Sequence, residues 1–157
     1  MIVSVNQENI NIAAEIHSIS WRESHRSFCR EDFINLHTTE HQQKYIAEKM
    51  KKGSKFYMLY DNAPVAVVSV NKDLIEDLYV LPKQQNRGYG TQLLSYVVSK
   101  IQDLDLIPSL WILENNHGAE RLYLKNGFIA SGRRNHTTGK LDEIEYIKCK
   151  SRGDFDG

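Results

Sequence analysis

A short glycine-containing stretch, Gln85-Asn86-Arg87-Gly88-Tyr89-Gly90-Thr91, joins two segments whose apolar residues follow different periods. The segment before it, residues 74–81, is strand-like and ends at Pro82, which has no backbone N–H to give to a sheet. The segment after it has apolar residues at steps of three and four, which is the period of one helix face. The order strand, loop, helix therefore predicts that this loop lies at a helix N-terminus. The apolar residues of that helix are Leu93, Leu94, Val97, Val98, Ile101 and Leu104.

A loop at a helix N-terminus presents unpaired backbone N–H groups and the positive end of the helix dipole to an anion. Gly88 and Gly90 carry no Cβ, so a pyrophosphate can approach the bare amides, and Arg87 adds a positive charge. The Walker loop is excluded because no Gly-Lys-Ser/Thr follows, and the glycine spacing excludes the dinucleotide fingerprint. Taken alone, the stretch is equally consistent with an ordinary tight loop.

Composition predicts one α/β domain and excludes several classes of partner. The chain has 157 residues, of which 41% are hydrophobic, enough for one sizeable core. Twenty basic residues balance twenty acidic ones, so we expect neither nucleic acid nor an anionic membrane as a partner. Cys29 and Cys149 lack metal-ligand spacing and are expected to be reduced thiols, with no metal site. The first eleven residues lack the basic start and apolar core of a secretory leader, and no apolar run spans a bilayer; both predict a cytoplasmic protein.

Periodicity predicts an order of elements within a single domain over residues 1–149, followed by a flexible tail at 150–157. A third helix is expected to start at Thr38 or Thr39, because Thr39 and Gln42 have the form of a capping box. In the last strand, Ile144 and Tyr146 are the expected inward pair. The expected strands are 2–5, 55–60, 65–71, 74–81, 110–113, 128–133 and 141–149, and the expected helices are 8–28, a short one from 30, one from 38 or 39 to 52, the long one after the loop, and 116–125.

A second motif identifies the glycine loop. The run Asn116-x-x-Ala119-x-x-x-Tyr123-x-Lys125-x-Gly127-Phe128 follows Gln85-x-x-Gly88-x-Gly90, and together they resemble the two core motifs of the GNAT superfamily of acyl-CoA N-acyltransferases. The resemblance covers residues 73–147 well and the first seventy residues only in their order of elements. It implies an α/β (α+β) fold with a mixed, mostly antiparallel central sheet and helices on both faces. It further implies an N-acetyltransferase that moves the acetyl group of acetyl-CoA to a primary amine by direct attack in a ternary complex.

The resemblance also implies how acetyl-CoA is held. In the family, the strand before the glycine loop and the strand after the long helix separate, and the pantetheine arm lies between them. Leu78, Tyr79 and Val80 are then expected to offer main-chain hydrogen bonds to pantetheine, although plain strand packing explains their side chains equally well. The pyrophosphate is expected on the amides of Gln85, Asn86, Arg87, Gly88, Tyr89, Gly90 and Thr91. Asn116, Ala119 and Tyr123 lie at helical spacing and are expected to contact the same cofactor.

Two residues are candidates for the chemistry. A primary amine with a pKa near ~10.4 is neutral in only about one molecule in 2,500 at pH 7, so a proton acceptor is needed. Glu76 is the first candidate, with an ordered water as the alternative, and strand alternation predicts that Asp77 points to the opposite face. Tyr123 is the family's proton donor to the leaving thiolate, although a core aromatic is the other interpretation.

The acceptor is not determined by the sequence. Trp21, His25 and Phe28 lie at helical spacing and form either an aromatic wall for a cation or ordinary core packing. No charged cluster in this half indicates a particular substrate, so the acceptor is a small-molecule or peptide amine. A noncatalytic acyl-CoA-binding sensor or assembly module is the alternative to an enzyme. Dimerisation is common in the family, so a homodimer is compatible with the sequence.

Overall fold

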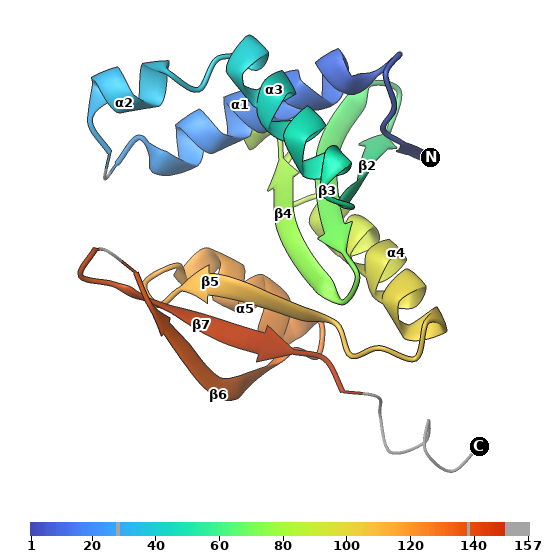
Figure 1. Cartoon of the computed structure of the whole chain (residues 1–157), viewed down its shortest axis with the longest axis vertical. Helices are drawn as coiled ribbons and strands as arrows, with labels where there is room; N and C mark the ends of the chain where they lie inside the picture. Colours follow the sequence, from blue (N-terminus) through green and yellow to red (C-terminus); the bar gives the residue numbers. More distant parts are fainter. Residues whose placement is uncertain (28, 138, 150–157) are drawn as a thin grey trace.

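The computed structural model describes residues 1–27, 29–137 and 139–149, which form a seven-stranded sheet with helices on both faces (Figure 1). The strand order is β1-β2-β3-β4-β5-β7-β6, and every neighbouring pair is antiparallel except β4 and β5. The expected α/β (α+β) fold with a mixed, mostly antiparallel sheet is therefore confirmed. The strands are β1 (Ile2–Ser4), β2 (Lys55–Tyr60), β3 (Pro64–Asn71), β4 (Leu74–Val80), β5 (Ser109–Leu113), β6 (Ile129–His136) and β7 (Asp142–Ile147).

Two groups of helices cover opposite faces of this sheet. α1 (Ile10–His25) and α3 (Thr39–Lys51) pack on one face of β2, β3 and β4, and the short α2 (Glu31–Asn35) connects them (Figure 1). α4 (Tyr89–Asp103) and α5 (His117–Lys125) lie on the other face. A single 3-10 turn, η1 (Pro82–Gln84), joins β4 to the glycine loop.

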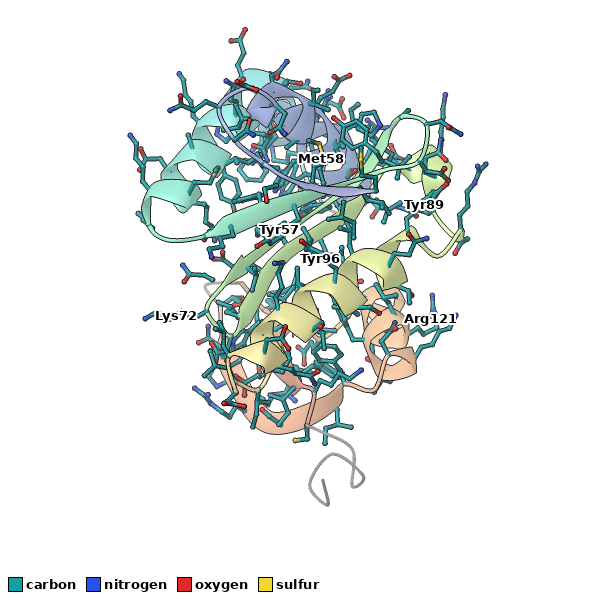
Figure 2. All side chains as sticks on the ribbon, turned by 90° about the vertical axis from the view of Figure 1, so that its right-hand side faces the viewer. Tyr57, Met58, Lys72, Tyr89, Tyr96 and Arg121 are labelled. Carbon is teal, nitrogen blue, oxygen red and sulfur yellow. The ribbon has the colours of Figure 1, made fainter. Side chains whose placement is uncertain are left out.

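Strands β2 and β3 are mostly apolar because both of their faces are covered by helices. On β2, Met58 points toward α1 and Tyr57 toward α4, as Figure 2 shows. The Tyr57 ring meets the Tyr96 ring of α4 at a centroid distance of 5.2 Å. The side chains of Met58 and Val67 are fully buried in the α1 layer, so the sheet separates two distinct apolar cores.

Most expected elements exist, and they differ from the structure mainly at their ends. α1 starts two residues later than predicted, and β6 extends three residues further than the predicted strand. Ile144 and Tyr146 both pack into the α4 layer, which confirms the predicted inward pair. Position 28, the end of the predicted first helix, and the predicted tail at 150–157 lie outside the described residues.

The start of α3 differs from the predicted capping box. Thr38 is the N-cap, and its side-chain oxygen accepts a hydrogen bond from the N–H of His41 at 3.2 Å. Thr39 is already the first helical residue. Gln42 cannot complete a box with Thr39, because its side-chain amide contacts His17 of α1 at 2.7 Å.

Replacing Thr38 by Ala should lower the free energy of unfolding by about 1 kcal/mol, because the N–H of His41 loses its acceptor. The matched control, Thr39→Ala, should change it by less than about 0.5 kcal/mol. Urea unfolding of the two variants and the wild type measures both values. Equal losses would show that the cap is not at Thr38.

Candidate functional site

β4 and β5 meet at one point and then separate. Their parallel pairing is recorded only at Leu74 and Ser109, the first residue of each strand. β5 continues along its other edge, where five residue pairs join it to β7. The β4 edge beyond Leu74 therefore has no neighbouring strand among the described residues, and the two strands diverge toward their carboxyl ends (Figure 1).

The backbone of β4 directs two residues into this separation. The N–H of Leu81 donates to the carbonyl of Val65 on the β3 side at 2.9 Å. Because hydrogen-bonding residues alternate along an antiparallel ladder, Tyr79 also faces β3, whereas Leu78 and Val80 direct their main-chain groups toward the open edge. The Val80 carbonyl accepts hydrogen bonds from the Ser20 hydroxyl and the Gln85 side-chain amide, each at 3.3 Å.

A β-bulge on β4 changes the direction of its two carboxylates. Asp77 pairs with Ser69 and Ile75 pairs with Val70, so Glu76 is an extra residue without a partner on β3. Both carboxylates consequently reach α3: Lys49 donates to Glu76, and Tyr45 donates to Asp77 at 3.0 Å. The prediction that Asp77 points to the opposite face from Glu76 is wrong, because a bulge interrupts strand alternation.

Glu76 is held by two donors. The Lys49 ammonium donates to one carboxylate oxygen, and the Ser54 hydroxyl donates to the other at 2.6 Å. A cavity of about 250 Å³ lies beside this ion pair, between α3, the start of β4 and the β5–β7–β6 strands. Its lining residues are Lys49, Leu74, Ile75, Glu76, Trp111, Asn135 and Glu143.

Asp77 has one engaged oxygen and one open oxygen. Its Oδ2 accepts hydrogen bonds from Tyr45 at 3.0 Å and from the Ser69 hydroxyl at 3.1 Å. Its Oδ1 lies 4.0 Å from Nε2 of His17, which is beyond hydrogen-bonding distance. The sequence does not indicate His17 and Asp77 as site residues, because their proximity depends on how α1 packs against the bulged strand β4 and no local pattern shows it.

The glycine loop has the backbone geometry that its sequence suggests. Gly88 is the N-cap of α4 with φ of 86°, a left-handed conformation that favours glycine. Among the described residues, no acceptor is recorded for the N–H groups of Tyr89, Gly90 and Thr91. A Cβ on Gly90 would lie 3.7 Å from side-chain carbons of both Val80 and Leu122, so this glycine sits between β4 and α5.

The side chains of the glycine loop differ in their exposure to solvent. Asn86 also adopts a positive φ, of 65°, and, like Gln85 and Arg87, it is exposed. The side chain of Tyr89 is buried, and its hydroxyl donates to Asp61. The Thr91 hydroxyl is 3.5 Å from the side-chain amide of Asn126, which connects the start of α4 to the end of α5.

α5 places Tyr123 under the separated strands. Asn116 is the N-cap of α5, and its side-chain oxygen accepts from the N–H of Ala119 at 3.1 Å. Tyr123 is 8% exposed, and the centroid of its ring lies 5.6 Å from that of Phe128. Its hydroxyl has no hydrogen-bond partner among the described residues. Burial, and then the negative charge of Asp77, raise the pKa of Tyr123 to about 12, so the phenol stays protonated at neutral pH.

The predicted acceptor residues form a stack of rings at the end of α1. The Trp21 ring stacks on His25 at 4.0 Å and on His37 at 3.5 Å. The His25 Nδ1 also lies 2.8 Å from the Trp21 carbonyl, and burial lowers the pKa of His25. Phe28, the third predicted residue, lies outside the described residues.

Comparison with known proteins identifies the family to which this chain belongs. The sequence matches the model of the Acetyltransferase (GNAT) family over residues 13–128, which is most of the chain. The chain belongs to the GNAT family of acetyltransferases. The resemblance inferred from its two motifs is thereby confirmed. A search of curated proteins finds no match.

Solved structures with this GNAT fold are similar to the chain over nearly its whole length. PaiA N-acetyltransferase from Thermoplasma acidophilum, in complex with coenzyme A, has a TM-score of 0.73 at 16% identity and covers 92% of this chain and 96% of its own. A GCN5-related N-acetyltransferase from Rhodopseudomonas palustris has a TM-score of 0.72 at 20% identity, covering 96% and 95%. The yncA protein of Salmonella typhimurium, with its cofactor acetyl-CoA, has a TM-score of 0.68 at 16% identity, covering 94% and 91%.

The helices of this GNAT chain are short. Within the described ranges, none is long and apolar enough to cross a membrane.

Replacing Gly88 by Ala should lower the free energy of unfolding by ~1–2 kcal/mol, because a Cβ is strained at its positive φ. Gly118→Ala is the matched control: it lies in α5 at an ordinary φ, its Cβ would meet only the Asn116 side-chain oxygen at an ordinary contact distance of 3.9 Å, and it should stabilise by up to ~1 kcal/mol. Chemical denaturation of both variants measures the two changes. An unchanged free energy of unfolding in Gly88→Ala would contradict the left-handed conformation assigned to this residue.

Proposed function

We propose that the chain transfers the acetyl group of acetyl-CoA to a primary amine by direct attack in a ternary complex. The observation that carries this proposal is the separation of β4 from β5 with an anion-binding loop at one end and Tyr123 beneath it. An extended thioester arm fits between two strands that no longer pair. A diphosphate fits the free N–H groups at the start of α4.

The cofactor contacts in this proposal follow the geometry of β4 and α4. The main-chain groups of Leu78 and Val80 face the separation and hydrogen-bond the amides of pantetheine, and Tyr79 contributes its side chain. The Asn116 side-chain oxygen already accepts the capping hydrogen bond of α5, so the NH2 group of this side chain is the part left to contact the cofactor. The pyrophosphate is held by the loop residues Gln85, Asn86, Arg87, Gly88, Tyr89, Gly90 and Thr91, and Ala119 and Tyr123 contact the thioester end.

The chemistry needs one proton donor and one proton acceptor. The neutral amine attacks the thioester carbon, the new C–N bond forms, and the C–S bond breaks. Tyr123 donates a hydrogen bond, and finally its proton, to the sulfur, whose basicity rises in the same buried surroundings. The amine proton leaves toward the carboxylates of β4, where Glu76 and Asp77 both lie on the α3 side.

Thermal melting tests the cofactor. Acetyl-CoA or CoA at about 100 times its dissociation constant stabilises by ~2.7 kcal/mol, which should raise Tm by ~5–10 °C for a domain of this size. NAD at the same concentration serves as the control and should leave Tm unchanged. No shift with either CoA compound at saturation would sink the proposal.

Tyr123→Phe tests catalysis separately from binding. We expect transfer, followed as CoA release with a thiol reagent, to fall tenfold or more while the acetyl-CoA melting shift is retained, because the phenol acts on the sulfur. Tyr96→Phe, on the core-facing side of α4, is the matched control and should stay within about twofold of wild type. A melting shift without transfer to any amine would instead indicate a noncatalytic acyl-CoA-binding module.

A further inference from the structure

A line of polar side chains runs from the surface of α3 into the protein and ends at Asp77. His41 Nδ1 lies 2.7 Å from Gln42 Oε1, and Gln42 Nε2 lies 2.7 Å from His17 Nδ1. His17 is 2% exposed, and its ring packs against Tyr79 at 4.7 Å and Tyr45 at 5.3 Å. The proposed cofactor contacts do not include any of His41, Gln42 or His17.

The neighbours of His17 determine where its proton lies. The Gln42 amide nitrogen is a donor only, so His17 Nδ1 accepts and the ring proton is on Nε2. The opposite tautomer would place a lone pair on Nε2 against the negative Oδ1 of Asp77. Burial lowers the pKa of His17, which keeps the ring neutral at pH 7.

His17 Nε2 is a buried donor without a partner. Among the described residues, it is a fully buried side-chain nitrogen without a hydrogen-bond partner, and it lies 4.0 Å from Asp77 Oδ1. Leaving such a donor unpaired costs about 1–3 kcal/mol, so a residue that only filled space would not carry one there. Asp77 Oδ1 likewise has no hydrogen-bond donor within the described ranges.

The two carboxylates of the bulge therefore differ in whether they have an oxygen without a hydrogen-bond donor. Both oxygens of Glu76 are occupied, by Lys49 and by Ser54. Asp77 uses only Oδ2 for its donors and leaves Oδ1 open. A proton arriving from the acceptor amine can be taken by Asp77 without breaking an existing contact, whereas Glu76 would have to release one.

Asp77 and Tyr123 approach the separated strands from opposite sides. Tyr123 belongs to the apolar layer of α4 and α5, and Asp77 contacts α1 and α3. They are nevertheless close enough for the Asp77 charge to contribute to the raised pKa of Tyr123 and of Tyr79. A thioester lying between β4 and β5 thus has a proton donor on one side and a proton acceptor on the other.

We infer that Asp77 Oδ1 is the catalytic proton acceptor for the attacking amine and that His17, fixed by Gln42, is its positioning residue; this rests on the acetyltransferase function proposed above. As the amine nitrogen bonds to the carbonyl carbon, its proton passes to Asp77 Oδ1, the electron pair of the C–S bond leaves with sulfur, and sulfur takes the Tyr123 proton. The His17 N–H dipole, 4.0 Å from Oδ1, favours a negatively charged oxygen at this position before the proton arrives. The protonated Asp77 and the Tyr123 phenolate return to their starting states by proton exchange with solvent.

The charged and titratable groups around Asp77 come from four elements, so a pH profile reports the group as a whole. They are His17 on α1, Tyr45 and Lys49 on α3, Glu76 and Tyr79 on β4, and Tyr123 on α5, with the Ser69 hydroxyl on β3 as a further donor. The His17 N–H is a dipole, not a bonded donor, at 4.0 Å from Asp77 Oδ1. Its removal should therefore move the acidic limb of the rate profile to higher pH.

The first experiment compares the two carboxylates. Transfer is measured as CoA release with four amines, namely benzylamine, phenethylamine, 1,4-diaminobutane and Nα-acetyl-lysine, and the best wild-type acceptor is used for the variants. Asp77→Asn should lower kcat about 100-fold with the acetyl-CoA melting shift retained, and the loss should shrink above pH 9 as more amine is already neutral. Glu76→Gln should lower kcat less than about fivefold.

The reverse order, with Glu76→Gln the more damaging, would overturn the assignment of Asp77 while leaving the acetyltransferase function standing. A wild-type protein that transfers to none of the four amines and shows no acetyl-CoA melting shift would remove the proposed function, and the inference with it. The two failures are therefore distinguishable in one set of assays.

The second experiment tests His17 with a donor-removing and a donor-keeping change. His17→Phe should lower kcat about tenfold, leave the acetyl-CoA KM within twofold, and move the acidic limb to higher pH. His17→Gln should restore most of kcat and the wild-type limb, because its amide N–H can occupy the Nε2 position. Equal behaviour of the two variants would show that His17 only fills space.

Two further measurements keep the role of His17 testable if His17→Phe does not fold. Nitrogen-15 NMR of the wild-type ring at pH 7 should show a neutral ring protonated on Nε2, and protonation on Nδ1 would contradict the proposal without any assay of activity. Tyr45→Phe removes one donor from the other oxygen of Asp77 and should move the acidic limb in the same direction. An unmoved limb would argue against donor control of this carboxylate.

Discussion

The single residue pair between β4 and β5 is the constraint on which the rest of the structure depends. A sheet normally satisfies its backbone groups by pairing, and β4 gives up this pairing on one edge after Leu74. The two halves of the sheet stay together through α4 and α5, whose apolar side chains pack across both. The open edge, the position of the α4 N-terminus and the place of Tyr123 all follow from that arrangement.

The two faces of the sheet have different tasks. On the α4 and α5 face, the first N–H groups of α4, after Gly88, have no acceptor among the described residues, and burial raises the pKa of Tyr123. On the α1 and α3 face, the bulge at Glu76 turns two carboxylates toward donors on α3. The Tyr123 phenol and the Asp77 carboxylate therefore lie on opposite faces of the sheet, separated by β4.

Patterns that repeat locally could be predicted from the sequence, and features that depend on distant partners could not. The glycine loop, the long amphipathic α4 and the α5 motif each contain enough apolar periodicity or spacing to define the fold and the loop. The prediction that Asp77 points away from Glu76 was wrong, because a bulge is set by the register of β3 against β4. Likewise, Thr38 and Thr39 are equivalent caps in sequence until Gln42 is found bonded to His17.

The unpaired edge of β4 also has a mechanical consequence. The main-chain groups of Leu78 and the N–H of Val80 face this edge, whereas the Val80 carbonyl already accepts from Ser20 and Gln85, so an extended ligand placed there would continue the sheet. It would bridge the β1–β4 half to the β5–β7–β6 half at the place where the protein supplies only one residue pair. The two halves of the sheet would then be less able to move relative to each other with the ligand bound than without it.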